Sequence, residues 1–379
     1  MVVACACSIG AELTSELPET FAPRGFKTGH LACFPALSYD LTYTDNATRV
    51  TRHAQQDFLS EYAGCLSPRF QPDENVTLSA SYEFGWHDYV RNTAKHYLSH
   101  RASGEFRVTN AFIEGLSFSA GDSYLQTGNT SALENQILAF TRYDTNTAFA
   151  KTQYEFNRFS VSGKYAYSLT DYFRRADASS DDHTNSGEVE GAYKFLPGRL
   201  SIFGTYNFTR TAFDIVPLQD FDTHTVMVGV RGTYSKLDYA VSAGYSAALN
   251  VNRHGENNGP AFEAALAYAP HKRLLTSVVA SRRFVAGVLT GISTDTNLKA
   301  AVTVRLTRRG RLSFDYTRND SRYLIGSTQL SLAYTTSLEY KLTRYAAATV
   351  SYARTEREAP AGTTVFLINE GHLGMRLAW

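Results

Sequence analysis

Cysteine is scarce in this chain, and its placement argues against a fold held by disulfides or metal. The 379 residues include four cysteines, at positions 5, 7, 33 and 65. They form no C-x-x-C pair and no cysteine–histidine group with zinc spacing, so we expect no structural metal. Cys33 and Cys65 could close a hairpin, but the alternation of their segments places the two side chains on opposite faces, which disfavours a bridge. The cysteine-free remainder suits an oxidising compartment.

A surplus of either charge is also missing. Lysine and arginine number 37, and aspartate and glutamate number 36, so the formal net charge is +1. Proteins that bind nucleic acid usually carry a basic excess, so we expect no nucleic-acid partner. The even balance also argues against a long acidic or basic tail.

Long hydrophobic runs are absent. No run approaches the roughly 20 apolar residues that a membrane helix needs, and the mean hydropathy is -0.27. On their own, these features would indicate a water-soluble protein. They do not test for a transmembrane barrel, whose strands show only alternation in segments of about ten residues.

What the chain does have is aromatic residues in alternating segments. It contains 24 Tyr and 23 Phe against 10 Pro and 3 Met, which favours strands. Residues 237–251, LDYAVSAGYSAALNV, place apolar side chains on one face and small or polar side chains on the other. Residues 76–86, 298–306 and 330–342 repeat this pattern. No segment of comparable length has a 3.6-residue period, so we expect almost no helix.

The alternating segments follow one another in a regular rhythm. We count about eighteen strands (sixteen is an alternative), joined alternately by tight turns such as 156–159 and by longer polar stretches such as 171–187. This arrangement is typical of an up-and-down antiparallel barrel. One segment departs from it, because the phase of residues 115–126 puts Asp122 on the apolar face. We expect a β-bulge or an early strand end there.

The width of such a barrel decides which face points outward. Eighteen strands would enclose a lumen too wide for side chains to fill, so the apolar face is predicted to contact lipid and the polar face an aqueous lumen. Aromatic residues beside the tight turns, among them Phe156, Phe159 and Tyr234, would form a girdle at one membrane interface. We therefore predict an all-β transmembrane barrel with short periplasmic turns and longer extracellular loops.

Charged residues occupy the polar face of the predicted strands. Against lipid, a lysine or arginine would cost roughly 2–4 kcal/mol at mid-bilayer. In a lumen these residues would contact a polar solute or form cross-strand ion pairs, and both alternatives stay open. No ring of a single sign appears, so we expect weak ion selectivity. The predicted lumen-lining residues are Glu83, Arg107, Lys151, Glu155, Lys164, Glu188, Glu190, Arg231, Asp238, Glu263, Lys299, Arg305, Asp315, Glu339, Lys341, Glu370 and Arg376.

The end of the chain, GHLGMRLAW at 371–379, has apolar residues at alternate positions and a terminal tryptophan. It resembles the signal with which bacterial outer-membrane proteins engage the barrel-assembly machinery. The residues in the matching positions are Leu373, Met375, Leu377 and Trp379.

The body of the chain resembles the family known as putative β-barrel porin type 2. The resemblance rests on residues 37–50, 73–84 and 142–168, and the strand rhythm extends it to about residues 34–379. It implies a barrel in the outer membrane of a Gram-negative-type bacterium, with no catalytic motif and no cofactor. Some members are associated with exopolysaccharide or exosortase systems, which implies envelope secretion components as one class of partner.

Signatures of enzymes and metal sites are missing. The chain contains no G-x-S-x-G, H-E-x-x-H or P-loop motif, so we predict no catalytic residue. Triad residues can come from separate strands, which leaves an outer-membrane hydrolase as an alternative. Two polar groups in predicted loop regions could hold a cation, although solvated loops are the stronger expectation: Asp181, Asp182 and His183, and His87, His96 and His100.

These observations divide the chain into two regions. Residues 1–33 are predicted to be a signal remnant or periplasmic lead-in, and residues 34–379 the barrel. The predicted function is passage of polar solutes or export of polysaccharide. A non-conducting barrel that serves as an envelope scaffold or attachment point is the main alternative. The expected partners are outer-membrane lipid and the barrel-assembly machinery; the solute and the oligomeric state stay open.

Overall fold

A computed structural model describes most of the chain. The described residues are 25–46, 55–91, 96–110, 113–128, 142–173, 181–214, 220–250, 256–287, 291–323, 328–358 and 366–379. No helix in these ranges is long and apolar enough to cross a membrane.

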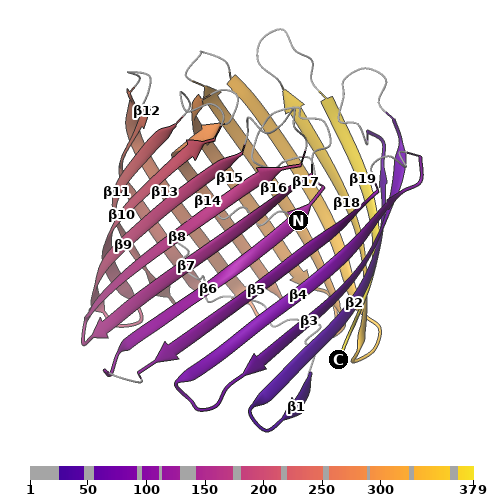
Figure 1. The fold of residues 1–379 in the computed structure, drawn as a ribbon, viewed down its shortest axis with the longest axis horizontal. Helices are drawn as coiled ribbons and strands as arrows, with labels where there is room; N and C mark the ends of the chain where they lie inside the picture. Colours follow the sequence, from indigo (N-terminus) through magenta and orange to yellow (C-terminus); the bar gives the residue numbers. More distant parts are fainter. Residues whose placement is uncertain are drawn as a thin grey trace.

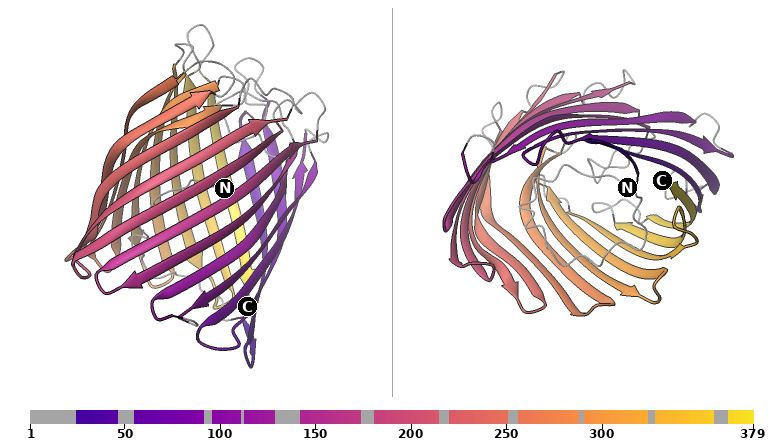
Figure 2. Two further views of the ribbon diagram at one scale, coloured as in Figure 1. Left: turned by 60° about the vertical axis from the view of Figure 1, so that its left-hand side comes forward. Right: turned by 90° about the horizontal axis from the view of Figure 1, so that it is seen from below.

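Eighteen strands, β2 to β19, form one closed antiparallel barrel (Figures 1 and 2). Each strand pairs with its neighbours in sequence, and β19 pairs with β2 to close the ring. The predicted fold class is therefore confirmed. The strands are β2 (Leu31–Thr44), β3 (Asp57–Phe70), β4 (Val76–Tyr89), β5 (Tyr97–Thr109), β6 (Leu116–Thr127), β7 (Tyr143–Phe156), β8 (Phe159–Tyr172), β9 (Asp182–Leu196), β10 (Leu200–Phe213), β11 (Phe221–Tyr234), β12 (Leu237–Asn250), β13 (Glu256–His271), β14 (Leu274–Gly287), β15 (Gly291–Arg305), β16 (Gly310–Tyr323), β17 (Thr328–Lys341), β18 (Ala346–Glu358) and β19 (Phe366–Ala378).

The apolar side chains of the strands lie on the outer surface of the barrel. On β11, Val226 and Val228 are 54% and 62% exposed, whereas Met227 between them is 7% exposed. Met227 packs on the inner side with Ala192, Phe203 and Ala261. A soluble barrel would show the opposite polarity, because its apolar face would fill the core.

Tight turns join the strands at one end of the barrel. Between β7 and β8 only two residues turn the chain, and Asn157 adopts a φ of 51°. Two-residue hairpins require such positive φ values, which asparagine tolerates better than most residues. Phe156 and Phe159 face each other across this turn, and both are exposed on the outer surface, as a girdle requires.

The first barrel strand begins earlier than predicted. β2 starts at Leu31 rather than at residue 34, and a three-residue strand, β1 (Phe26–Thr28), pairs antiparallel with its beginning. Residues 1–24, which hold most of the predicted signal remnant or lead-in, lie outside the described residues. Cys33 and Cys65 are both free, as the alternation of their segments predicted.

The expected irregularity at Asp122 is wrong. β6 continues to Thr127, and its register with β5 and with β7 is unbroken. Asp122 lies on the outer face in phase with the exposed Phe118, and its Oδ1 accepts a hydrogen bond of 3.1 Å from Asn146 on β7. The neighbouring amide supplies a donor to the outward carboxylate, so the strand need not bulge to turn it inward.

Candidate functional site on the inner wall

The charged residues predicted to line the lumen lie on the strand faces opposite the exposed apolar side chains. On β4, for example, Glu83 alternates with the exposed Tyr82 and Phe84. Part of this set borders a cavity of about 1590 Å³ on the inner side of β5 to β12, namely Arg107, Lys151, Glu155, Lys164, Glu188, Glu190, Arg231 and Asp238. The others lie elsewhere on the inner face, namely Glu83, Glu263, Lys299, Arg305, Asp315, Glu339, Lys341, Glu370 and Arg376.

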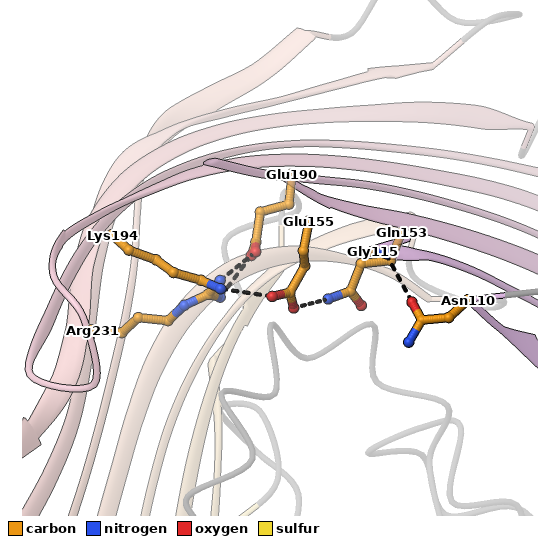
Figure 3. Close-up of polar contacts among 7 residues, drawn as sticks. All are labelled: Asn110, Gly115, Gln153, Glu155, Glu190, Lys194 and Arg231. Atoms are coloured by element: carbon orange, nitrogen blue, oxygen red, sulfur yellow. Dashed lines mark hydrogen bonds and ion pairs between the residues drawn. The ribbon is translucent and has the colours of Figure 1, made fainter. Parts of the chain in front are cut away.

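Arg231 and Glu190 form the most enclosed ion pair of this cavity (Figure 3). Two guanidinium nitrogens donate to the two carboxylate oxygens, at 3.0 and 2.7 Å. The guanidinium also lies 4.9 Å from the centre of the Phe203 ring. Such a two-bond arrangement fixes both side chains, and the adjoining ring shields them from water.

Glu155 is the centre of a second group, close to the short turns (Figure 3). Its carboxylate accepts a bond of 2.6 Å from Lys194 Nζ and one of 3.0 Å from Gln153 Nε2. The backbone nitrogen of Glu155 donates to Gly115 O at 2.9 Å, and Gly115 N donates to Asn110 Oδ1 at 2.8 Å. The turn between β5 and β6 is thereby tied to the wall that carries these charges.

Two lysines on the same wall are left without such partners. Lys151 lies directly opposite Lys164 in the β7–β8 pairing, and Lys164 lies opposite Glu188 in the next pairing. Neither lysine has a hydrogen bond or a close ion pair with a described residue, although both act electrostatically on Glu188. Like charges placed opposite each other are unfavourable, so this pair is poised to attract an anionic group from the lumen.

Two carboxylates lie side by side on the inner wall, near the pairing of β19 with β2. Asp40 on β2 lies directly opposite Glu61 on β3, and Glu61 lies opposite His87 on β4. His87 Nδ1 is 3.6 Å from Glu61 Oε2, and its Nε2 makes a 2.9 Å hydrogen bond with Ser99 Oγ. This part of the inner wall therefore holds two facing carboxylates with a histidine beside one of them.

The two groups considered as cation sites do not assemble. His87 lies on the inner face and His100 on the outer face, where it bonds Tyr82. Asp182 and His183 belong to β9, so they lie within a strand rather than in the long polar stretch predicted at 171–187. Within the described ranges, no cluster of three or more histidine, cysteine, aspartate or glutamate side chains could hold a metal ion.

Asp181 lies just before β9, outside the barrel strands. Its Oδ1 accepts a 2.7 Å hydrogen bond from Tyr172 N. Burial raises the pKa of this carboxyl despite that bond, and the nearby acidic groups of Asp171 and Asp214 act in the same direction.

Asp40 and Phe203 also belong to the inner wall, although neither is among the residues predicted to line it. Asp40 lies on the inner face of β2, directly opposite Glu61. Phe203 is 2% exposed and faces inward, whereas the sequence predicts that apolar side chains contact lipid. Its phase with Thr205 and Asn207 on β10 was the available signal.

The C-terminal residues lie where the barrel closes. Leu373 and Met375 are exposed on the outer face, while Leu377 and Trp379 are half-buried. Trp379 N donates to Pro35 O at 3.3 Å, and Trp379 O accepts from Gly25 N at 2.8 Å. The role of these residues as an assembly signal stays a prediction.

The sequence profile of a family described as Putative beta-barrel porin 2 matches residues 18–379. The chain belongs to this family. The family and the barrel fold together imply that the protein is located in the outer membrane. No curated protein matches the chain.

Solved structures of outer-membrane proteins share the barrel. The Pseudomonas aeruginosa outer-membrane protein OpdK matches with a TM-score of 0.53 at 9% identity, over 92% of this chain and 99% of that one. OpdL from the same organism matches with a TM-score of 0.53 at 8% identity, over 93% and 99%. Vibrio cholerae OmpT matches with a TM-score of 0.46 at 14% identity, over 93% and 99%. At these identities the likeness to OpdK and OpdL establishes the fold and nothing about the solute.

Proposed function

We propose that this porin-like barrel is a channel that passes small polar solutes across the outer membrane of a Gram-negative bacterium, with the short turns in the periplasm. The family membership and the polarity of the two barrel faces support this proposal. The mixed charges of the inner wall favour weak selectivity rather than strict selection of one ion sign.

The proposal rests on one observation: along a single cavity, some cationic side chains are paired with carboxylates and others are not. Arg231 and Lys194 are held by carboxylates, while Lys151 and Lys164 point into the same cavity without close partners. Paired charges keep the wall in shape, and unpaired lysines remain available to a passing solute. A barrel that only needed mechanical stability would gain nothing from two facing lysines.

Planar-bilayer recording tests the proposal. The purified barrel should give discrete conductance steps, and the double substitution K151Q/K164Q should shift the reversal potential in a salt gradient toward cation preference while the steps persist. The matched control is K236Q/K272Q, which removes two lysines from the short turns and should leave the reversal potential close to that of the unchanged protein. If the folded barrel gave no conductance steps, the channel proposal would be wrong and the scaffold alternative would be favoured. Long blocks of the current by added polysaccharide would favour polymer export over small solutes.

A further inference from the structure

The outer surface of β14, β15 and β16 carries two arginines that the channel does not use. Arg282 lies opposite Phe262 on β13 and Thr296 on β15, and Arg318 lies opposite Leu298 on β15. Phe262 and Leu298 are outward-facing and at least one-third exposed, so both arginines share the apolar outer face. They flank β15, about 10 Å apart across the sheet and two residues, or about 7 Å, apart along β15, which places their Cα atoms about 12 Å from each other.

Neither guanidinium is neutralised by the described part of the protein. Arg282 and Arg318 have no hydrogen bond or ion pair with any described residue, and Arg282 Nε is buried without a partner. The nearest outward carboxylate in the register is Asp320, which lies opposite Thr296 and is 3.9 Å from Arg322 Nε. Unpaired arginine is costly against lipid, and the cost falls toward the membrane interface.

A row of tyrosines marks that interface. Five strands that begin at a short turn carry an outward tyrosine whose hydroxyl bonds a polar side chain on the next strand. In each case the polar residue lies one outward position beyond the residue that pairs with the tyrosine, on the side of the long connections. The pairs are Tyr82–His100, Tyr124–Asp144, Tyr165–Asn185, Tyr206–His224 and Tyr352–Asn369. Amphipathic rings with hydrogen-bonded tips are typical of the boundary between lipid tails and headgroups.

The two arginines lie at the level of this boundary. Tyr316 is the seventh residue of β16, as Tyr82, Tyr165 and Tyr206 are of their own strands, and Arg318 is the next outward position. On the opposite side of the barrel the same next position holds apolar or aromatic residues, Phe84, Tyr167 and Phe208. The arginines are therefore a local feature of β14 and β16, on one side of the wall.

We propose that Arg282 and Arg318 bind the phosphate group of a phosphorylated glycolipid in the outer leaflet. Guanidinium groups on both sides of β15 would share the phosphate oxygens, since arginine matches phosphate by paired hydrogen bonds. Phe262 and Leu298 lie directly beside the two arginines, and Phe314 lies nearer the short turns, so together they form an exposed apolar ledge for acyl chains. The combination of two free cations with adjoining apolar surface fits a lipid better than a free anion.

The test measures lipid retention by the folded, detergent-purified barrel. Diphosphoryl lipid A is added, and bound lipid is counted by native mass spectrometry. The double substitution R282Q/R318Q should weaken binding at least about tenfold. The control is R210Q, which removes an outward arginine on β10 that already faces Asp222 at 3.8 Å, and which should retain binding.

Four results would overturn the proposal. Unchanged lipid binding by R282Q/R318Q would show that these arginines do not bind the lipid. An equal loss of binding in R210Q would show that binding depends only on the overall positive charge of the barrel. Competition by inorganic phosphate at concentrations similar to those of the lipid would make the site one for free anions. Retained binding of a dephosphorylated lipid A with the same acyl chains would show that the ledge acts alone.

Discussion

At the scale of single residues, the inner wall separates charges that are fixed from charges that are available. Arg231 and Lys194 differ from Lys151 and Lys164 only in their neighbours, since all four project into one cavity. The carboxylates of Glu190 and Glu155 hold the first two. The energetic consequences of removing a charge should therefore differ from site to site.

Glu190→Gln should destabilise the barrel by about 2 kcal/mol, because it leaves a partly buried guanidinium without its counter-charge. The Arg231 side chain is 28% exposed and that of Glu190 is 13% exposed. The measurement is urea unfolding of the protein in lipid vesicles, followed by the heat-dependent gel shift.

The control is Glu105→Gln on the same wall. Its partner Arg107 is 60% exposed, and solvated pairs of this kind contribute less than about 1 kcal/mol. Equal losses in the two variants would contradict the assignment of Arg231–Glu190 as the enclosed pair.

At the scale of strands, close approach of neighbouring backbones depends on glycine. A Cβ atom at Gly244 on β12 would lie 1.8 Å from Val226 O and 2.7 Å from Met227 Cα, both on β11. Backbone atoms in a continuous ladder cannot move aside as a side chain can. The two strands must separate if anything larger than hydrogen is placed there.

Gly244→Ala should therefore lower the free energy of unfolding by at least about 3 kcal/mol or prevent folding. Gly104→Ala on β5 is the matched control, because a Cβ there would meet nothing within 4 Å. The yield of heat-modifiable barrel after refolding measures both variants. A normal yield for Gly244→Ala would show that β11 and β12 are not packed as described.

At the scale of the whole molecule, the barrel exists only when β19 reaches β2. The backbone of Trp379 bonds both Pro35 and Gly25, so the last residue lies beside the seam. The seam joins segments from opposite ends of the chain, and closing it is the step with the largest loop-closure cost.

Deleting Trp379 should reduce the amount of barrel inserted in the outer membrane severalfold, while barrels that do insert keep their conductance. Trp86→Ala is the control, because Trp86 is the other tryptophan of the chain and is exposed on the outer face of β4. Insertion is measured by the heat-dependent gel shift of isolated membranes, and conductance in planar bilayers. Normal insertion with altered conductance would contradict the assembly role.

The sequence by itself determined the barrel class, the approximate number of strands and the alternation of the two faces along each strand. These features follow from the alternation of side chains between the two faces of a strand. This alternation is local, so it can be recognised in each segment separately. The alternation of Glu83 with Tyr82 and Phe84 was sufficient to orient β4. At Asp122 and Phe203 the alternation indicated the observed face, but the residue type did not suit that face, and a partner on a neighbouring strand makes each departure tolerable.

Only the tertiary structure decided which side chains meet. Arg231 reaches Glu190 over 41 residues of sequence and across β10, and Arg282 and Arg318 become neighbours only when β15 lies between them. These contacts depend on the register of three strands at once. The register is set by turn lengths and by ring closure, so no single segment contains the information that specifies it.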